Sequence, residues 1–102
     1  MNIKFSGHNI EITDALREIT TKKFAKLERF YSDIKEINVI FRVDKVMQSL
    51  EVNLNIWKNH IHAHAESEVL YDAIDDVVEK LYRQLEKIKE KMHDHHRGHP
   101  EE

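Results

Sequence analysis

The middle of the chain alternates between apolar and polar residues in three consecutive runs, and this pattern constrains the fold most. The runs are KEINVIFRV at residues 35–43, SLEVNLNIW at 49–57 and HIHAHAE at 60–66. A period of two places successive side chains on opposite faces of a strand. Short connections at 44–48 and 58–59 separate the runs, which predicts an antiparallel meander with one apolar and one polar face.

Helical periodicity flanks the meander on both sides. Apolar residues recur at helical spacing from residue 14 to about residue 32, directly after Thr13, which is a good N-cap. The same spacing returns from about residue 68 to residue 92, where Val69 opens the apolar stripe and Ser67 is the expected N-cap. The sequence therefore predicts two amphipathic helices, one before and one after the meander.

The fold class that these elements predict is α+β. A short strand that ends at Gly7 precedes the first helix, so the expected order is β-α-β-β-β-α. A right-handed crossover then makes the first two strands parallel neighbours. Because the polar face of the sheet carries Asn, Glu, Arg and His, both helices must cover the other face. We expect a two-layer sandwich, a four-stranded mixed sheet with two helices on one face, like a double-stranded-RNA-binding domain.

Length and composition favour one domain. The chain has 102 residues, which allow a single core, and we place it in residues 1–92. The remaining segment, HDHHRGHPEE at 93–102, has no apolar period and is expected to be a disordered, histidine-rich tail. The chain has no cysteine, and no run approaches a membrane span or a signal-peptide core. We therefore expect a cytoplasmic protein without a membrane partner.

Basic residues form rows on both predicted helices, although the net charge is only −3. On the second helix the row has spacings that keep its members on one side, and it comprises Lys80, Arg83, Lys87 and Lys91. On the first helix Lys22, Lys26 and Arg29 share one side, and Lys23 lies nearer the core edge. Two parallel cationic rows on one layer would match the phosphate lines beside an RNA groove. The alternative is that these charges only solvate the helix surfaces.

Histidines are the other chemically distinctive group. His60, His62 and His64 share the polar face of the last predicted strand, and such neighbours can share a metal ion. We favour an exposed polar strand, because no spacing typical of a closed metal site accompanies them. The sequence has no phosphate-binding glycine loop, nucleophile elbow or HExxH helix. We therefore expect no enzyme, metal site, cofactor or small-molecule substrate.

Two segments resemble a known family, and together the resemblance covers residues 1–92. NIKFSGHNIEITDALREITTKKFAKLERF is similar to the start of the bacterial ribosome hibernation-promoting factors, also described as ribosome-associated inhibitor or sigma-54 modulation proteins. LYDAIDDVVEKLYRQLEKIKEKM is similar to their second helix, with its Tyr-x-Ala-Ile-Asp start and its Lys-Leu-x-Arg-Gln-Leu-x-Lys continuation. The length resembles the short type of the family.

The resemblance implies a function on the ribosome. Family members bind the small subunit in the channel for messenger and tRNA, where occupied A and P sites block translation in stationary phase or stress. Short members promote inactive ribosome dimers with ribosome modulation factor, whereas others stabilise single inactive ribosomes and oppose dimers. The expected rRNA-binding residues are Lys22, Lys23, Lys26, Arg29, Lys80, Arg83, Lys87 and Lys91. A free-standing double-stranded RNA module and a metal-handling protein stay open as other classes.

Overall fold

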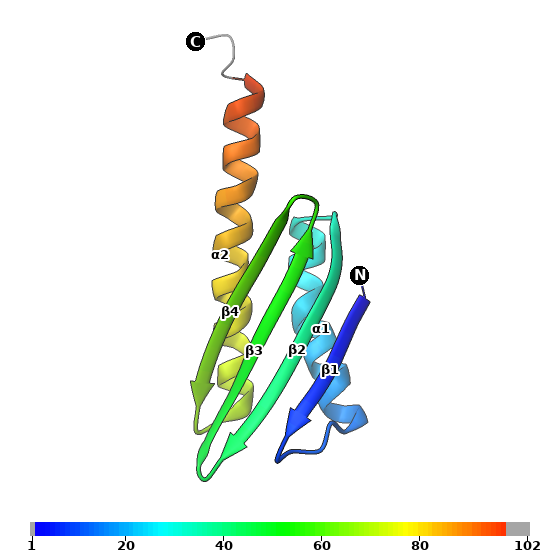
Figure 1. The fold of residues 1–102 in the computed structure, drawn as a ribbon, viewed down its shortest axis with the longest axis vertical. Coiled ribbons are helices and arrows are strands. Elements are labelled where there is room, and N and C mark those ends of the chain that lie inside the picture. Colours follow the sequence, from blue (N-terminus) through cyan, green and yellow to red (C-terminus); the bar gives the residue numbers. More distant parts are fainter. Residues whose placement is uncertain (1, 98–102) are drawn as a thin grey trace.

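The computed structural model describes residues 2–97 and forms a two-layer α+β sandwich (Figure 1). Its elements are β1 (Asn2–His8), α1 (Asp14–Phe30), β2 (Ile34–Asp44), β3 (Met47–Ile56), β4 (Asn59–Ser67) and α2 (Leu70–Arg97). The strand order is β1-β2-β3-β4, with β1 parallel to β2 and the other neighbours antiparallel. Both helices lie behind the same face of the sheet in Figure 1. The predicted fold class is confirmed.

The core lies between the sheet and the two helices. Along β2, β3 and β4 alternate residues are buried, and their apolar side chains meet those of the helices. Phe24 and Leu27 of α1, and Ile74, Leu81 and Leu85 of α2, are fully excluded from water. Removing this apolar surface from water is the dominant favourable term for such a fold. In the described part of the chain no element covers the opposite, polar face of the sheet.

α1 begins where the sequence predicts and ends two residues earlier. The hydroxyl of Thr13 accepts a hydrogen bond from the backbone N–H of Leu16 at 3.1 Å, as expected of an N-cap. At the other end Tyr31 has an extended backbone, and its N–H donates to the carbonyl of Leu27 at 2.8 Å. The helix ends there because the chain must turn into β2, whose first residue, Ile34, is buried.

α2 begins at Leu70, two residues later than predicted. The hydroxyl of Ser67 accepts the backbone N–H of Val69 at 3.1 Å, so Ser67 stabilises the turn before the helix and does not cap the helix itself. Val69, which the periodicity assigned to the apolar stripe, lies outside the helix and is 49% exposed. The expected stripe is correct from Leu70 onward.

The C-terminal end of α2 also differs from the prediction. The helix continues to Arg97, five residues beyond the expected end, because no glycine or proline interrupts it before Gly98. Residues 98–102 of the predicted tail lie outside the described residues. In Figure 1 the last turns of α2 extend past the sheet. None of the described helices is long and apolar enough to cross a membrane.

Gly7 lies within β1 and does not end the strand as the sequence suggested. It pairs with Phe41 of β2, and β1 continues to His8. A Cβ atom at position 7 would lie 2.7 Å from the carbonyl oxygen of Ile10 and 3.0 Å from Cδ1 of Ile12. The segment between β1 and α1 therefore folds back onto the strand at a distance that only glycine allows.

Replacing Gly7 with alanine should lower the free energy of unfolding by about 1–3 kcal/mol, since the new methyl group displaces a backbone carbonyl. Urea unfolding followed by circular dichroism measures this change. Ser6→Ala is the matched control in the same strand, because Ser6 is exposed, and we expect a change within about 0.5 kcal/mol. Equal stability of the two variants would contradict the close approach at Gly7.

Candidate nucleic-acid interface

The basic residues of α1 lie along a groove between the two helices. The α1 side of this groove is lined by Lys22, Lys23 and Lys26, and the α2 side by Asp75, Val78 and Glu79. Lys23, the least exposed of the three lysines, forms an ion pair with Asp75 across the groove. Arg29 is exposed in the last turn of α1. The groove therefore has one basic and one acidic side.

An aromatic contact holds the two helices together beyond this groove. The rings of Phe30 in α1 and Tyr82 in α2 are 4.5 Å apart between centroids. The ammonium group of Lys26 lies 5.0 Å from the centroid of the Tyr82 ring, and that of Lys89 lies 4.4 Å from the centroid of Phe30. Lys89 also donates to the backbone carbonyl of Phe30 at 3.0 Å. These contacts fix where α1 carries its basic residues relative to α2.

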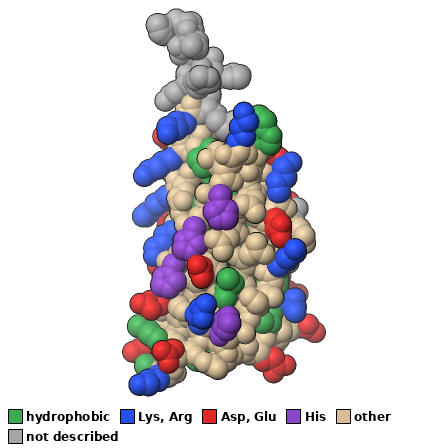
Figure 2. All heavy atoms as spheres, in the orientation of Figure 1, with side chains coloured by type: hydrophobic (Ala, Val, Ile, Leu, Met, Phe, Trp, Pro, Cys, Tyr) green, Lys and Arg blue, Asp and Glu red, His purple; other side chains and the backbone are tan. Residues whose placement is uncertain are grey.

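The basic residues of α2 begin at the outer edge of the sheet, beside β4. Lys80 Nζ donates to the backbone carbonyl of His64 at 2.7 Å, and Gln84 Nε2 donates to that of His62 at 2.9 Å. At about 100° per residue, Lys87 and Lys91 lie on the same side of the helix as Lys80. In Figure 2, Lys and Arg side chains follow the left edge of the molecule, where Figure 1 places α2 and β4. We name Lys80, Arg83, Lys87 and Lys91 the α2 row.

The two basic rows do not form one continuous surface, which corrects the expectation of adjacent rows on one layer. The α2 row lies on the β4 side of α2, whereas α1 packs on the other side. Carboxylates lie between the two rows. Asp75 pairs with Lys23, and Glu79 Oε2 lies 3.4 Å from Arg83 Nη2. We name Asp75 and Glu79 the acidic strip. Helical spacing alone could not say that α1 would pack on this side of α2.

The eight predicted residues differ in their partners. Three have a carboxylate neighbour, since Lys23, Lys80 and Arg83 pair with Asp75, Asp76 and Glu79, respectively. Among the side chains of residues 2–91, the other five form no ion pair; they are Lys22, Lys26, Arg29, Lys87 and Lys91. Exposed ion pairs contribute only about 0–1 kcal/mol, so a phosphate group can replace such a carboxylate at little cost.

Three contact residues on α2 were not among the predicted site residues. Gln84 joins α2 to β4, while Tyr82 and Lys89 join it to α1. Their signal in the sequence was weak, because each contact spans 22 or more positions along the chain. The sequence offers one local indication of such a contact: the residue is polar and lies beside the apolar stripe of its helix.

His60, His62 and His64 are exposed on the outer face of β4, as the alternation predicts. His60 Nδ1 lies 2.6 Å from Asn55 Oδ1, and His62 Nε2 lies 2.8 Å from Glu51 Oε2, both on β3. Among the side chains of residues 2–91, no three of His, Asp or Glu come close enough to hold a metal ion. The three histidines form a row of imidazoles, of which His60 and His62 contact polar groups of the neighbouring strand.

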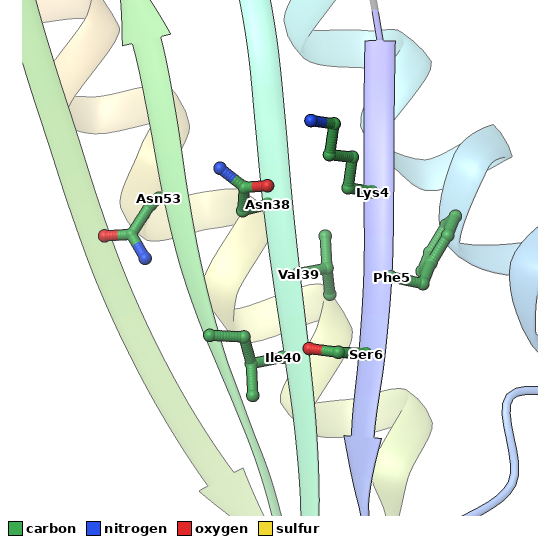
Figure 3. A pocket seen from close by; sticks show the side chains of 7 residues that line it. All are labelled: Lys4, Phe5, Ser6, Asn38, Val39, Ile40 and Asn53. Carbon is green, nitrogen blue, oxygen red and sulfur yellow. The ribbon is translucent and has the colours of Figure 1, made fainter.

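A shallow hollow lies on the same outer face, over β1, β2 and β3 (Figure 3). It is lined by Lys4, Phe5, Ser6, Asn38, Val39, Ile40 and Asn53. Figure 3 shows the amides of Asn38 and Asn53 on neighbouring strands, with Lys4 beyond them on β1. Lys4 forms an ion pair with Glu36 at 3.0 Å. The hollow offers hydrogen-bonding groups and one paired ammonium group, and its lining contains no carboxylate or imidazole.

Comparison with known proteins identifies the family. The family model described as "Sigma 54 modulation protein / S30EA ribosomal protein" matches residues 3–93. The chain belongs to this family. The ribosome hibernation promoting factors of Klebsiella oxytoca and Escherichia coli (strain K12) are each 43% identical to this S30EA-family chain over 95 residues. The match covers 93% of the chain and 100% of each relative, and it confirms the resemblance seen in the two sequence segments.

Two solved structures share the fold of this S30EA-family chain. A ribosomal subunit interface protein from Coxiella burnetii has a TM-score of 0.82 and 34% identity, covering 87% of this chain and 98% of that one. The N-terminal domain of Protein Y from Thermus thermophilus has a TM-score of 0.80 and 33% identity, covering 86% and 99%. The sandwich described above therefore accounts for nearly all of both structures.

In this S30EA-family chain, Asp75→Asn should lower the free energy of unfolding by less than about 1 kcal/mol, because the ion pair with Lys23 is exposed on the Asp75 side. Urea unfolding is the measurement. Asp33→Asn, which removes the exposed pair with Lys35, is the matched control and should behave alike. A loss of several kcal/mol in Asp75→Asn alone would mean that the pair is a structural link between the helices.

Proposed function

We propose that this S30EA-family chain is a ribosome hibernation factor that acts by binding and not by catalysis. The observation that carries the proposal is 43% identity, over the whole length of the relatives, to proteins named ribosome hibernation promoting factor. The proposed partner is the small ribosomal subunit with its rRNA, bound in the channel for messenger and tRNA. Occupying the A and P sites inhibits translation in stationary phase or stress, and the protein works in the cytoplasm.

The proposed rRNA contacts come from both helices, through the α2 row and Lys22, Lys23, Lys26 and Arg29 of α1. Ammonium and guanidinium groups bind phosphates without reading sequence, so they would position the domain on folded RNA. The acidic strip between the two sets argues against one duplex laid across both helices, since its phosphates would meet Asp75 and Glu79. A channel with RNA on more than one side would reach both sets, which supports the proposed location.

We further propose that the bound factor promotes or stabilises inactive ribosome dimers. Ribosome modulation factor would take part indirectly, by acting on the same ribosomes. The support is the name of the relatives, hibernation promoting factor, and their full coverage by this chain. The alternative within the family is an inhibitor that stabilises single inactive ribosomes and opposes dimer formation.

Reversing the charge of Lys80, Arg83 and Lys87 to Glu should weaken binding to purified small subunits at least about 100-fold, because three phosphate contacts become repulsive. Sedimentation of the protein with the subunits measures binding. All three side chains are exposed, and circular dichroism verifies that the variant stays folded without the contact from Lys80 to the His64 carbonyl.

The matched control reverses Lys35, Lys45 and Lys58, which are exposed and lie outside both basic sets. It changes the net charge by the same amount and should retain binding. Full binding by the Lys80, Arg83 and Lys87 variant would overturn the proposed contact surface. Equal losses in both variants would show that only net charge matters.

A generic RNA duplex in moderate excess should not displace the wild-type protein from the subunits. Displacement would favour a free-standing double-stranded RNA module.

Sucrose-gradient profiles of ribosomes with the purified protein distinguish the two family alternatives. We expect the protein to shift ribosomes toward the dimer fraction when ribosome modulation factor is present. A promoting factor should increase this fraction above the level that ribosome modulation factor produces alone. A decrease below that level would establish the opposing type of inhibitor.

A further inference from the structure

The outer face of β4 continues the α2 row across the edge of the sheet. Figure 2 shows histidine side chains in a diagonal line beside the Lys and Arg side chains of the left edge. The β4 backbone joins the two groups, because the carbonyls of His64 and His62 accept from Lys80 and Gln84 at 2.7 and 2.9 Å. His60 is the third member of the line, one alternate position further along β4. The imidazoles therefore neighbour the first ammonium group of the α2 row.

The charge of this face depends on whether the imidazoles are protonated. On the outer face β3 and β4 carry two other titratable groups, Glu51 and Glu66. Glu51 lies 2.8 Å from His62 and is paired in register with His64, whereas Asn55 faces His60. From α2, Lys80 with its partner Asp76 borders the row, and Lys87 follows on the same side. When the imidazoles are neutral, the outer face of β3 and β4 has a negative charge from Glu51 and Glu66. When the imidazoles are protonated, the net charge of this face becomes positive.

We propose that His60, His62 and His64 are a second, proton-dependent set of phosphate contacts, which extends the α2 row for binding an RNA backbone. This inference rests on the proposed function, because it assigns further contacts to the same RNA ligand. Histidine side chains change charge between about pH 5 and 8. Protonating His62 offsets the charge of Glu51, and the two charges added at His60 and His64 outweigh the single charge of Glu66. A phosphodiester chain that follows the α2 row then meets attraction on both sides of the β4 edge.

The ligand chemistry follows from what the histidine row offers. Exposed imidazolium groups on one strand face present N–H donors at regular spacing, which suits phosphate oxygens. β3 and β4 carry no Phe, Tyr or Trp for stacking bases, and the exposed Trp57 lies in the turn between the two strands. The row therefore strengthens binding to an RNA backbone and does not select its sequence.

The test is equilibrium binding of the full chain to purified small ribosomal subunits at about pH 6 and pH 8, at constant ionic strength. The variant replaces the three histidines by glutamine, H60Q/H62Q/H64Q. The matched control is H8Q, which removes an exposed histidine at the end of β1, the strand at the opposite edge of the sheet. Circular dichroism at both pH values verifies that all proteins are folded.

Wild type and H8Q should bind about tenfold more tightly at the lower pH, with a steeper dependence on salt, because more phosphates are contacted. In H60Q/H62Q/H64Q the affinity should change less than about twofold between the two pH values. If H60Q/H62Q/H64Q shows the same pH dependence as wild type, this inference is overturned. The proposed function stays intact in that case, provided that wild type binds the subunits at the higher pH. Absence of binding by wild type at both pH values would overturn both.

Discussion

The burial of a single apolar sheet face under two helices is the constraint on which the rest of the structure depends. The opposite face carries amide, carboxylate and imidazole groups, so the helices have only one surface to cover and must lie side by side. Their contact is made by Phe30 and Tyr82, with Lys26 and Lys89 over the rings. This arrangement decides which side of each helix faces solvent, and hence where each basic residue can meet a ligand.

The edge of β4 gives the α2 row a structural role in addition to its charge. An edge strand presents unpaired carbonyl groups, which invite pairing with another chain. Lys80 and Gln84 donate to two of these carbonyls, so α2 protects the edge while its ammonium group stays exposed. A lysine has three donor hydrogens, and Lys80 can therefore keep its backbone contact and still bind an anion.

The distribution of charge matters more than its sum. A chain with a net charge of −3 can still present two basic surfaces, because carboxylates such as Asp75 and Glu79 gather in a strip between them. The same strip would repel an RNA duplex that spans both helices. Each basic row would attract phosphate groups, and the strip between the rows would disfavour RNA of the wrong shape. For the proposed rRNA ligand, this distribution of charge favours a site with RNA on more than one side.

Local patterns in the sequence determined the element order, the parallel first pair of strands, most of the core and the composition of each basic row. Those features follow from side-chain periodicity within one strand or helix. Tertiary structure alone decided the ends of the helices, the need for glycine at position 7, and the separation of the two basic rows. Each depends on contacts between residues far apart in the chain, such as Lys23 with Asp75 and Gln84 with β4. Periodicity orients a side chain around its own helix axis, and it carries no information about which neighbour packs on which side.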